Sequence, residues 1–481
     1  MFEVVIGLEV HLALNTNSKI FSASAADSFG QLPNVNVDPV CLGLPGSLPT
    51  INRAAVEKAI MFSLAVNCQV PELTQFHRKH YFYPDLPKNY QISQYDRPIG
   101  AHGYIDISPE RRIGITRCHL EEDAGKSMHP TYADYSLVDL NRTGTPLIEM
   151  VTEPEIHSPE EARVFLNQVR AIAQALGVSE ANPEEGKMRA DVNVSLRRPG
   201  APLGTKVEVK NLNSFKSVQR ALEFEIKRQS RLLEAGSSIR QDTLGWDDGG
   251  QKTYLLRSKE GEADYRYLPE PDLPPMRIDQ AWLERLRHCL PELPDAKYQR
   301  YLEQGIRAYD AELIAYDADA AKFFDRMLEH YQARLQASQL QGDVQSLANW
   351  LNADISGWLN AQTLRLRDAL VSPEHIVAMV VMVDAGVISG KTAKDLLPEI
   401  MQGHDPEALV EARGLKQITD SSEVAAMVDA VIASNPAVAA QVADNPKAIN
   451  ALLGQVMKQS QGKAKPELVR QLLAERLQVE A

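Results

Sequence analysis

Four segments of the chain alternate apolar and polar residues with the period of two that is typical of a half-buried β-strand. Residues 5–14 carry Glu9 and His11 opposite an apolar row. Residues 188–197 and 205–210 repeat this alternation. The polar rows hold carboxylates, an imidazole and basic groups, where an ordinary surface strand carries Thr, Ser and Lys. They therefore predict a cleft that binds a divalent cation and a phosphate, and they favour an enzyme.

The fourth segment, residues 145–151, places Glu149 in an otherwise apolar strand. A bare carboxylate in such a position is costly unless it is paired or bound to a metal ion. In residues 188–197, the polar row contains Arg189, Asp191 and Asn193. The same kind of face therefore recurs in strands that are far apart in the sequence.

Between these strands, helical periodicity appears in only a few places before residue 292. One helix is predicted to begin after Ser158, with Ser158 as its N-cap, Pro159 in its first turn and Glu161 completing a capping box. A second is predicted over residues 215–235. Because strands and irregular loops do not alternate regularly with helices, the pattern predicts an α+β domain built on antiparallel sheet.

After residue 292, nearly every segment has helical periodicity. We expect a helical domain over residues 293–405 and a separate small helical domain over residues 406–481. Prolines at positions 436, 446 and 466 are predicted to break the helices of the last domain. Together with the mixed domain, residues 1–292, this gives three domains in a chain of 481 residues.

Composition narrows the class of protein. Hydrophobic residues make up 44% and charged residues 24%, as in ordinary soluble proteins. There is no apolar run of the ~20 residues that a membrane helix needs, and no basic leader. The four cysteines form no CxxC pair, which favours free thiols and a cytoplasmic protein. The net charge of −13 argues against general adhesion to nucleic acid, although residues 447–481 carry six basic against three acidic side chains.

The tract ITRCHLEEDAGKS contains Glu121, Glu122 and Asp123 in succession. One interpretation is a charged turn at the start of a helix. The other is a metal site, because adjacent carboxylates repel each other unless a cation lies close to them. Considered with Glu9, His11 and Glu149, the metal site is the better interpretation, and mixed carboxylate and imidazole ligands fit Mg²⁺ or Mn²⁺.

The stretch FHRKHYFYPDLPKNYQISQYDRP interleaves basic and aromatic residues, among them Lys79, Tyr81, Tyr83 and Lys88. Such a mixture can stack bases and neutralise phosphates, or it can be a proline-stiffened loop whose aromatic rings pack inward. Two segments resemble a phosphate-binding Walker loop, but both lack its first glycine. The chain offers no convincing nucleophilic serine or cysteine, so any ammonia drawn from an amide has to come from a partner.

Taken together, these segments resemble the B-subunit family of the tRNA-dependent aspartyl/glutamyl-tRNA amidotransferases. The resemblance runs almost from end to end and is carried by VIGLEVHLAL, CLGLPGSLP, RKHYFYPDLPKNYQISQYDRPIG, GITRCHLEEDAGKS, YSLVDLNRTGTPLIEMVTEPEI, EEGKMRADVNVSLR, GTKVEVKNLNSF and DYRYLPEPDLPP. Each string is weak alone, but their common order is highly specific.

The resemblance implies a cradle domain, a helical domain and a YqeY-like tail. It implies a heterotrimer in which a glutaminase A subunit supplies ammonia and a small C subunit ties the other two together. In this family the chain phosphorylates the side-chain carboxylate of a misacylated tRNA with ATP and Mg²⁺, and ammonia then displaces the phosphate. The expected substrate is Glu-tRNA(Gln), Asp-tRNA(Asn) or both, and neither DNA nor a membrane is an expected partner.

Carried over residue by residue, the resemblance implies roles for the following positions. The expected metal ligands are Glu9, His11, Glu122 and Glu149, with Glu121 and Glu184 as weaker candidates. Contacts to ATP phosphates or a second metal ion are expected from Asp191 and Asn193, and contacts to the transferred phosphoryl group from Lys210 and Arg189. Glu122, Lys210 and Arg189 are the expected catalytic residues. The tRNA is expected to meet Tyr81, Tyr83, Lys88, Lys458, Lys463 and Lys465. The main alternative is a catalytically silent tRNA-binding scaffold with a structural ion, and a stand-alone ligase using free ammonia is another.

Overall fold

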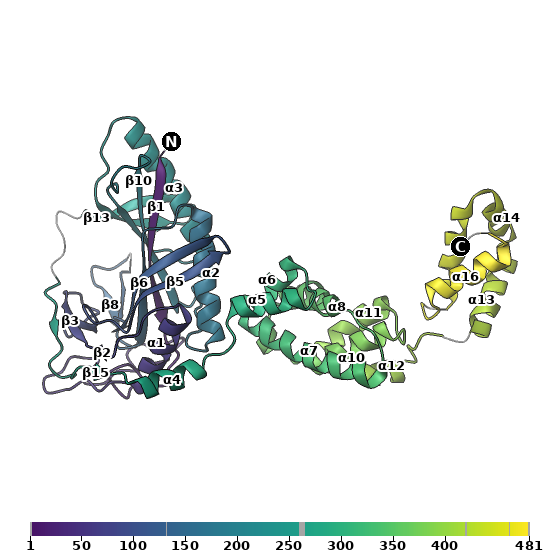
Figure 1. Cartoon of the computed structure of the whole chain (residues 1–481), viewed down its shortest axis with the longest axis horizontal. Coiled ribbons are helices and arrows are strands. Elements are labelled where there is room, and N and C mark those ends of the chain that lie inside the picture. The colour runs from purple at the N-terminus through teal and green to yellow at the C-terminus, as the bar shows by residue number, and fades with distance from the viewer. Residues whose placement is uncertain (1, 131, 259–264, 419–420, 461, 480–481) are drawn as a thin grey trace. The chain divides into compact units, whose positions relative to one another are not determined.

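The computed structural model describes residues 2–130, 132–258, 265–418, 421–460 and 462–479 (Figure 1). The chain forms two compact units, Met1–Pro294 and Asp295–Ala481. The first combines sheet with helices, and the second is helical. This is the predicted α+β class, with the strands confined to the N-terminal part as expected. The predicted division into three domains stays a prediction.

The described residues of the first unit form four helices. Their bounds are α1 Arg53–Ala65, α2 Pro159–Ala175, α3 Phe215–Glu234 and α4 Gln280–His288. Its strands are β1 Glu3–Ala13, β2 Leu73–Thr74, β3 His77–His80, β4 Tyr90–Ser93, β5 Gly100–Ser108, β6 Arg111–Glu122, β7 Lys126–Met128, β8 Leu137–Asp139, β9 Pro146–Thr152, β10 Met188–Arg197, β11 Val207–Lys210, β12 Asp242–Asp247, β13 Lys252–Ser258, β14 Leu268–Pro269 and β15 Met276–Arg277.

The main sheet has the strand order β13-β12-β11-β10-β1-β9-β6-β5. All of its pairs are antiparallel except β11 with β12, which run parallel. The strands predicted from alternation are β1, β9, β10 and β11, and all four lie side by side in the middle of this sheet. The N-terminal strand β1 therefore lies near the centre of the sheet, between β9 and β10.

One face of the sheet forms the hydrophobic core of the unit. Ile6, Leu8, Val10 and Leu12 of β1 are fully buried there, as the alternation predicted. Helices α1, α2 and α3 pack against this face. The opposite face carries the polar residues of the same strands, because successive side chains of a strand point to opposite sides. The apolar row therefore holds the polar row in a fixed orientation.

The helix boundaries follow local capping chemistry. Ser158 Oγ accepts a hydrogen bond from Glu161 N at 3.1 Å and caps α2, as predicted. The capping box is shifted by one residue, because the Glu161 carboxylate accepts from the backbone N–H of His157 rather than from that of Ser158. Helix α3 ends where predicted, and Gly236 follows it with a φ of +74°, a conformation that glycine adopts without strain.

The second unit consists of helices joined by short connections. They are α5 Pro294–Glu303, α6 Ala308–Ala315, α7 Ala318–Ser338, α8 Val344–Asn349, a π-helical turn Trp350–Ile355, α9 Ser356–Gln362, a 3₁₀ turn Leu366–Asp368, α10 Pro373–Asp384, α11 Gly390–Ile400, α12 Pro406–Ala412, α13 Ser421–Ser434, α14 Pro436–Asp444, a 3₁₀ turn Pro446–Ala448, α15 Ile449–Gln459 and α16 Pro466–Leu477.

Two separate hydrophobic clusters lie within the second unit. One involves α5 to α12 and extends to Leu415, and the other involves α13 to α16. Helix α12 packs with α10 and α11, so the first of these clusters continues beyond residue 405. Pro436, Pro446 and Pro466 each stand at the first position of a helical segment, so the predicted helix breaks at these prolines are confirmed.

Among the described residues, no single helix has both the length and the apolar composition needed to cross a membrane. One pair, Ser421–Ser434 with Pro436–Val442, meets these criteria jointly, and it is bent by 100°.

Gly103 of β5 provides a test of core packing. A Cβ atom at this position would lie 2.5 Å from Cys68 Sγ and 2.5 Å from the backbone oxygen of Val66. We expect Gly103→Ala to destabilise the first unit by about 1–3 kcal/mol, because the backbone oxygen cannot move aside without losing its hydrogen bond from Tyr104 N. Thermal and urea unfolding of the full chain, followed by tryptophan fluorescence, measure this.

The matched control is Gly7→Ala in β1, where the nearest atoms to a new Cβ are 3.8 Å away. This substitution should change the unfolding midpoint little. Equal midpoints for both variants would contradict the packing described around Gly103.

Candidate active site

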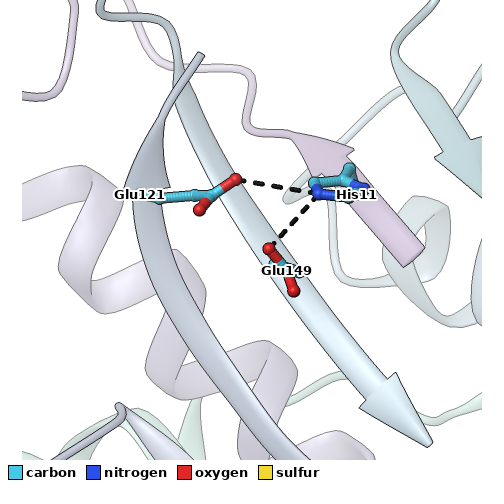
Figure 2. Close-up of side chains that lie close together, drawn as sticks. All are labelled: His11, Glu121 and Glu149. Atoms are coloured by element: carbon cyan, nitrogen blue, oxygen red, sulfur yellow. Dashed lines mark ion pairs between the residues drawn. The ribbon is translucent and has the colours of Figure 1, made fainter. Parts of the chain in front are cut away.

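A row of polar side chains crosses three neighbouring strands on the face opposite the helices. The register sets His11 of β1 opposite Glu149 of β9, and Glu149 opposite His119 of β6. Glu121 lies two residues beyond His119, so its side chain is on the same face. Figure 2 shows the carboxylates of Glu121 and Glu149 directed toward the imidazole of His11 from these strands. We name these four residues the imidazole–carboxylate cluster.

Both imidazoles lie within reach of both carboxylates. His11 Nε2 is 3.3 Å from an oxygen of Glu149 and 3.8 Å from an oxygen of Glu121. His119 Nε2 is 3.3 Å and 3.6 Å from oxygens of the same two residues. One donor atom from each of His11, Glu121 and Glu149 lies within 4.8 Å of the others. Imidazole nitrogen and carboxylate oxygen at this spacing form a suitable donor set for a divalent cation.

Electrostatic attraction within the cluster keeps its carboxylates ionised. Burial alone would raise the pKa of Glu149, but His119 and His11 hold that pKa well below its ordinary value. Burial and the charge of Glu149 oppose ionisation of Glu121, yet His119 and Lys79 lower the pKa of Glu121 on balance. Burial would lower the pKa of His119, whereas the two carboxylates raise it to about 9. The two carboxylates are therefore ionised, whereas His119 is protonated at neutral pH, so a cation that binds this imidazole displaces its proton.

A second group of carboxylates, which we name the carboxylate cluster, lies beside the first. It contains Glu9 of β1, Asp191 of β10 and Glu208 of β11, whose ligand oxygens lie within 4.8 Å of one another. Asn193 Nδ2 donates a hydrogen bond to Glu9 Oε1 at 2.9 Å. Lys210 Nζ contacts Asp191 and lies 3.1 Å from Glu208 Oε1. In this cluster the ammonium group of Lys210 partly neutralises the negative charge of the three carboxylates.

Two guanidinium groups converge on a third position of the same face. Arg189 of β10 lies opposite His11 in the sheet, and its Nη2 donates to Asp123 Oδ2 at 2.8 Å. Arg142 Nε is 3.4 Å from the same Asp123 oxygen and donates to the carbonyl of Ala124. Asp123 is buried and raises the pKa of Arg189. The aspartate therefore fixes the orientation of both arginines.

Members of all three groups line one pocket of about 410 Å³, a size within the usual range of small-ligand sites. Its lining is formed by His11, Lys79, Tyr81, Gln91, Glu121, Asp123, Ala124, Arg142, Leu147, Arg189, Ala190, Asp191, Lys210, Asn211, Leu212 and Asn213. Carboxylates, basic groups and one tyrosine ring thus share a single cavity.

The structure brings most of the expected metal and phosphate residues together. Eight of them lie on the polar face of adjacent strands, namely Glu9, His11, Glu121, Glu149, Arg189, Asp191, Asn193 and Lys210. Glu121, expected as a weaker ligand, is a full member of the imidazole–carboxylate cluster.

Glu122 is not part of either cluster. It ends β6, and because side chains alternate along a strand, its carboxylate lies on the opposite face from that of Glu121. There it accepts a hydrogen bond from Ile92 N at 3.0 Å and pairs with Lys88. Its position does not support the expected roles in metal binding and catalysis. The consecutive acids were expected to act as one group, whereas the pleat of a strand separates them.

The remaining expected residues are divided between the pocket, other parts of the first unit and the second unit. Lys88 is 6% exposed and forms an ion pair with Glu122. Glu184 is exposed and belongs to neither cluster. Tyr81 lines the pocket, whereas Tyr83 is 55% exposed. The three lysines expected to bind tRNA lie in the second unit, and they are Lys458, which is exposed, and Lys463 and Lys465, which are partly buried.

Five charged residues of the site had been given no individual role from the sequence, namely Lys79, His119, Asp123, Arg142 and Glu208. The signal for His119 was present, because it and Glu121 stand at alternate positions of one strand, and Asp123 follows directly after that strand. Glu208 stands between Val207 and Val209 in a predicted strand, again on the polar side. Lys79 lies in β3, which belongs to a different sheet from the clusters, and no local pattern places it beside them.

Comparison with known proteins shows which family the chain resembles. A family model described as the GatB/GatE catalytic domain matches residues 4–284, and one described as the GatB domain matches residues 335–477. The B subunit of the aspartyl/glutamyl-tRNA(Asn/Gln) amidotransferase of Deinococcus radiodurans is 56% identical over 480 residues, an alignment that covers 99% of each chain. The chains of the same name from Thermus thermophilus and Carboxydothermus hydrogenoformans are 54% and 48% identical, covering 100% and 99% of each chain.

The first family model alone covers more than half of the chain, and the similarity to these relatives extends over its whole length. The chain belongs to the family of aspartyl/glutamyl-tRNA(Asn/Gln) amidotransferase B subunits.

Proposed function

We propose that this chain phosphorylates the side-chain carboxylate of a misacylated tRNA and then converts it to the amide. A carboxylate oxygen of Glu-tRNA(Gln) or Asp-tRNA(Asn) attacks the γ-phosphorus of ATP, and the bond from that phosphorus to the ADP oxygen breaks. Ammonia then attacks the carbonyl carbon of the acyl phosphate. Phosphate leaves with the C–O electron pair, and the nitrogen loses a proton to water. The proposal is carried by the concentration of carboxylates, imidazoles and basic groups around one pocket.

The charges of the pocket suit this reaction. Acyl phosphate formation brings a carboxylate toward a polyanion, so it needs positioning and charge neutralisation more than it needs a strong base. The attacking carboxylate is already ionised at neutral pH. Arg189 and Lys210 line the pocket and offer N–H donors to phosphate oxygens. Their ion pairs with Asp123 and Asp191 keep the two basic groups in place.

The donor atoms of both clusters fit divalent cations. His11, Glu121 and Glu149, with His119 beside them, would hold Mg²⁺, and Mn²⁺ fits the same donors. Such an ion would neutralise charge on the phosphates of ATP. The carboxylate cluster would hold a second ion, and Asn193 and Lys210 orient its carboxylates.

The pocket provides no means of releasing ammonia from glutamine. None of the described residues that line it is a serine or cysteine. We therefore propose that a partner A subunit releases the ammonia, that a small C subunit joins the two, and that the three chains form a heterotrimer. We assign tRNA contacts to the last part of the chain, residues 447–481, where six basic side chains stand against three acidic ones.

The first test is phosphate release from [γ-³²P]ATP by the chain assembled with its A and C subunits. Glu-tRNA(Gln) and Asp-tRNA(Asn) are added separately, with and without Mg²⁺. We expect release that requires both the cation and one misacylated tRNA. Tight tRNA binding without release would support a scaffold with a structural ion instead.

The imidazole–carboxylate cluster is tested by cation binding. We expect Glu149→Gln to weaken Mn²⁺ binding by tenfold or more, on the order of the loss for removing one important interaction at a metal site. Glu122→Gln is the matched control and should leave Mn²⁺ affinity unchanged, because this carboxylate lies on the other face. Titrations followed by electron paramagnetic resonance measure both. A weakened affinity in Glu122→Gln, with normal affinity in Glu149→Gln, would contradict the assignment.

The proposed tRNA contacts are tested by salt dependence. Replacing Lys458, Lys463 and Lys465 together with alanine should reduce the slope of log affinity against log salt by up to about three, since each phosphate contact contributes roughly one unit. The loss of affinity should therefore be largest at low salt. Lys227→Ala is the control, because Lys227 is exposed on α3 in the first unit. An unchanged slope in the triple variant would remove these lysines from the tRNA interface.

A further inference from the structure

The pocket contains one basic group whose role is not explained by the ion pairs around it. Of the four basic residues that line it, Arg142 and Arg189 are paired with Asp123, and Lys210 is paired with Asp191. Within the part of the chain that the structure describes, Lys79 has neither an ion pair nor a hydrogen bond to its ammonium group. Its N–H donors are therefore available to an anion that enters the pocket.

Two tyrosine rings flank this ammonium group. Lys79 Nζ lies 5.1 Å from the ring centroid of Tyr265 and 6.0 Å from that of Tyr81. Ring faces stabilise a cation but provide no oxygen that accepts its N–H groups. Lys79 is held in β3, where it lies opposite Gln91 of β4, another residue that lines the pocket. The lysine is therefore positioned by aromatic contacts and strand pairing, and no carboxylate among the described residues forms an ion pair with it.

The ammonium group stays charged at neutral pH. Burial alone would lower the pKa of Lys79, but the negative charges of Glu121 and Glu149 raise it well above its ordinary value. Those two carboxylates belong to the cluster that we assign to a cation. Lys79 thus provides a permanent positive charge on the aromatic side of the pocket.

We propose that Lys79 is a further catalytic residue, whose ammonium group binds the side-chain carboxylate of the misacylated tRNA and holds it for phosphorylation. This inference rests on the proposed function. The side-chain carboxylate is attached through the aminoacyl ester to the terminal nucleotide of the tRNA, and aromatic rings are the usual surface on which such a base stacks. Tyr81 and Tyr265 place that surface next to the lysine. The groups that suit ATP phosphates, Arg189 and Lys210, lie on strands of the main sheet.

The same contact would bind the substrate more tightly than the product. A carboxylate forms a charge-assisted hydrogen bond with an ammonium group, whereas the amide of the product is neutral and forms a weaker one. Lys79 therefore favours binding of Glu-tRNA(Gln) over Gln-tRNA(Gln), and the product leaves more readily than the substrate. The same reasoning applies to Asp-tRNA(Asn) and Asn-tRNA(Asn).

The test compares the affinities of the assembled complex for the misacylated tRNA and for the same tRNA carrying the amide, without ATP. The wild-type complex should bind the carboxylate form roughly tenfold more tightly, as expected for a charge-assisted hydrogen bond. Lys79→Met should abolish this preference while keeping wild-type affinity for the amide form, which also shows that the variant is folded. Lys79→Arg should keep the preference, because it keeps the charge.

The matched control is Lys394→Met, which removes a lysine that also lies over an aromatic ring, that of Trp350 in the second unit. Its preference for the carboxylate form should equal that of the wild type. A preference that persists in Lys79→Met would overturn the inference. If the KM for ATP were also raised in that variant, Lys79 would contact the nucleotide instead of the tRNA carboxylate.

The two proposals fail in different ways. If the wild-type complex shows no tRNA-dependent phosphate release, the proposed function is wrong. If release is normal and the binding preference does not depend on Lys79, only the role of this lysine is wrong.

Discussion

The position of each charged group on the polar face depends on the register of β1 with its two neighbouring strands. Pairing with β9 aligns His11 with Glu149, and pairing with β10 aligns Glu9 with Asp191. A slip of one residue would turn Glu9 and His11 toward the helices and expose Leu8 and Val10 instead. The hydrophobic core therefore constrains the geometry of the site, because a register shifted by one residue would bury charged groups without partners.

Opposite charges in contact make this concentration of acids compatible with folding. An isolated carboxylate of this kind would cost several kcal/mol to bury, and the cost falls when a partner lies close. Asp123 is surrounded by two arginines, and Glu149 lies between two imidazoles. Lys79 differs from these groups because its neighbours are aromatic rings. The pocket thus combines groups that are already neutralised with one that is left for a ligand.

The sequence predicted which side of a strand each residue lies on better than it predicted which strands pair with one another. Alternation assigned Glu9, His11 and Asp191 to polar faces, because one face of each strand is apolar and the period is two. It could not give the strand order, which depends on pairings between residues far apart in the chain. The adjacent acids Glu121 and Glu122 were treated as one group, although strand geometry places them on opposite faces. Lys79 was beyond reach because its proximity to the clusters results from the packing of one sheet against another.

The central place of β1 also has a consequence for biosynthesis. This strand lies within the first 13 residues, whereas its neighbours are Pro146–Thr152 and Met188–Arg197. It leaves the ribosome long before either partner has been made, and pairings so distant in sequence form slowly. Both hydrogen-bonding edges of β1 remain uncovered until residue 152 has emerged, and the edge that pairs with β10 remains uncovered until residue 197. The time taken to translate this stretch thus sets a minimum period during which the nascent chain is open to aggregation.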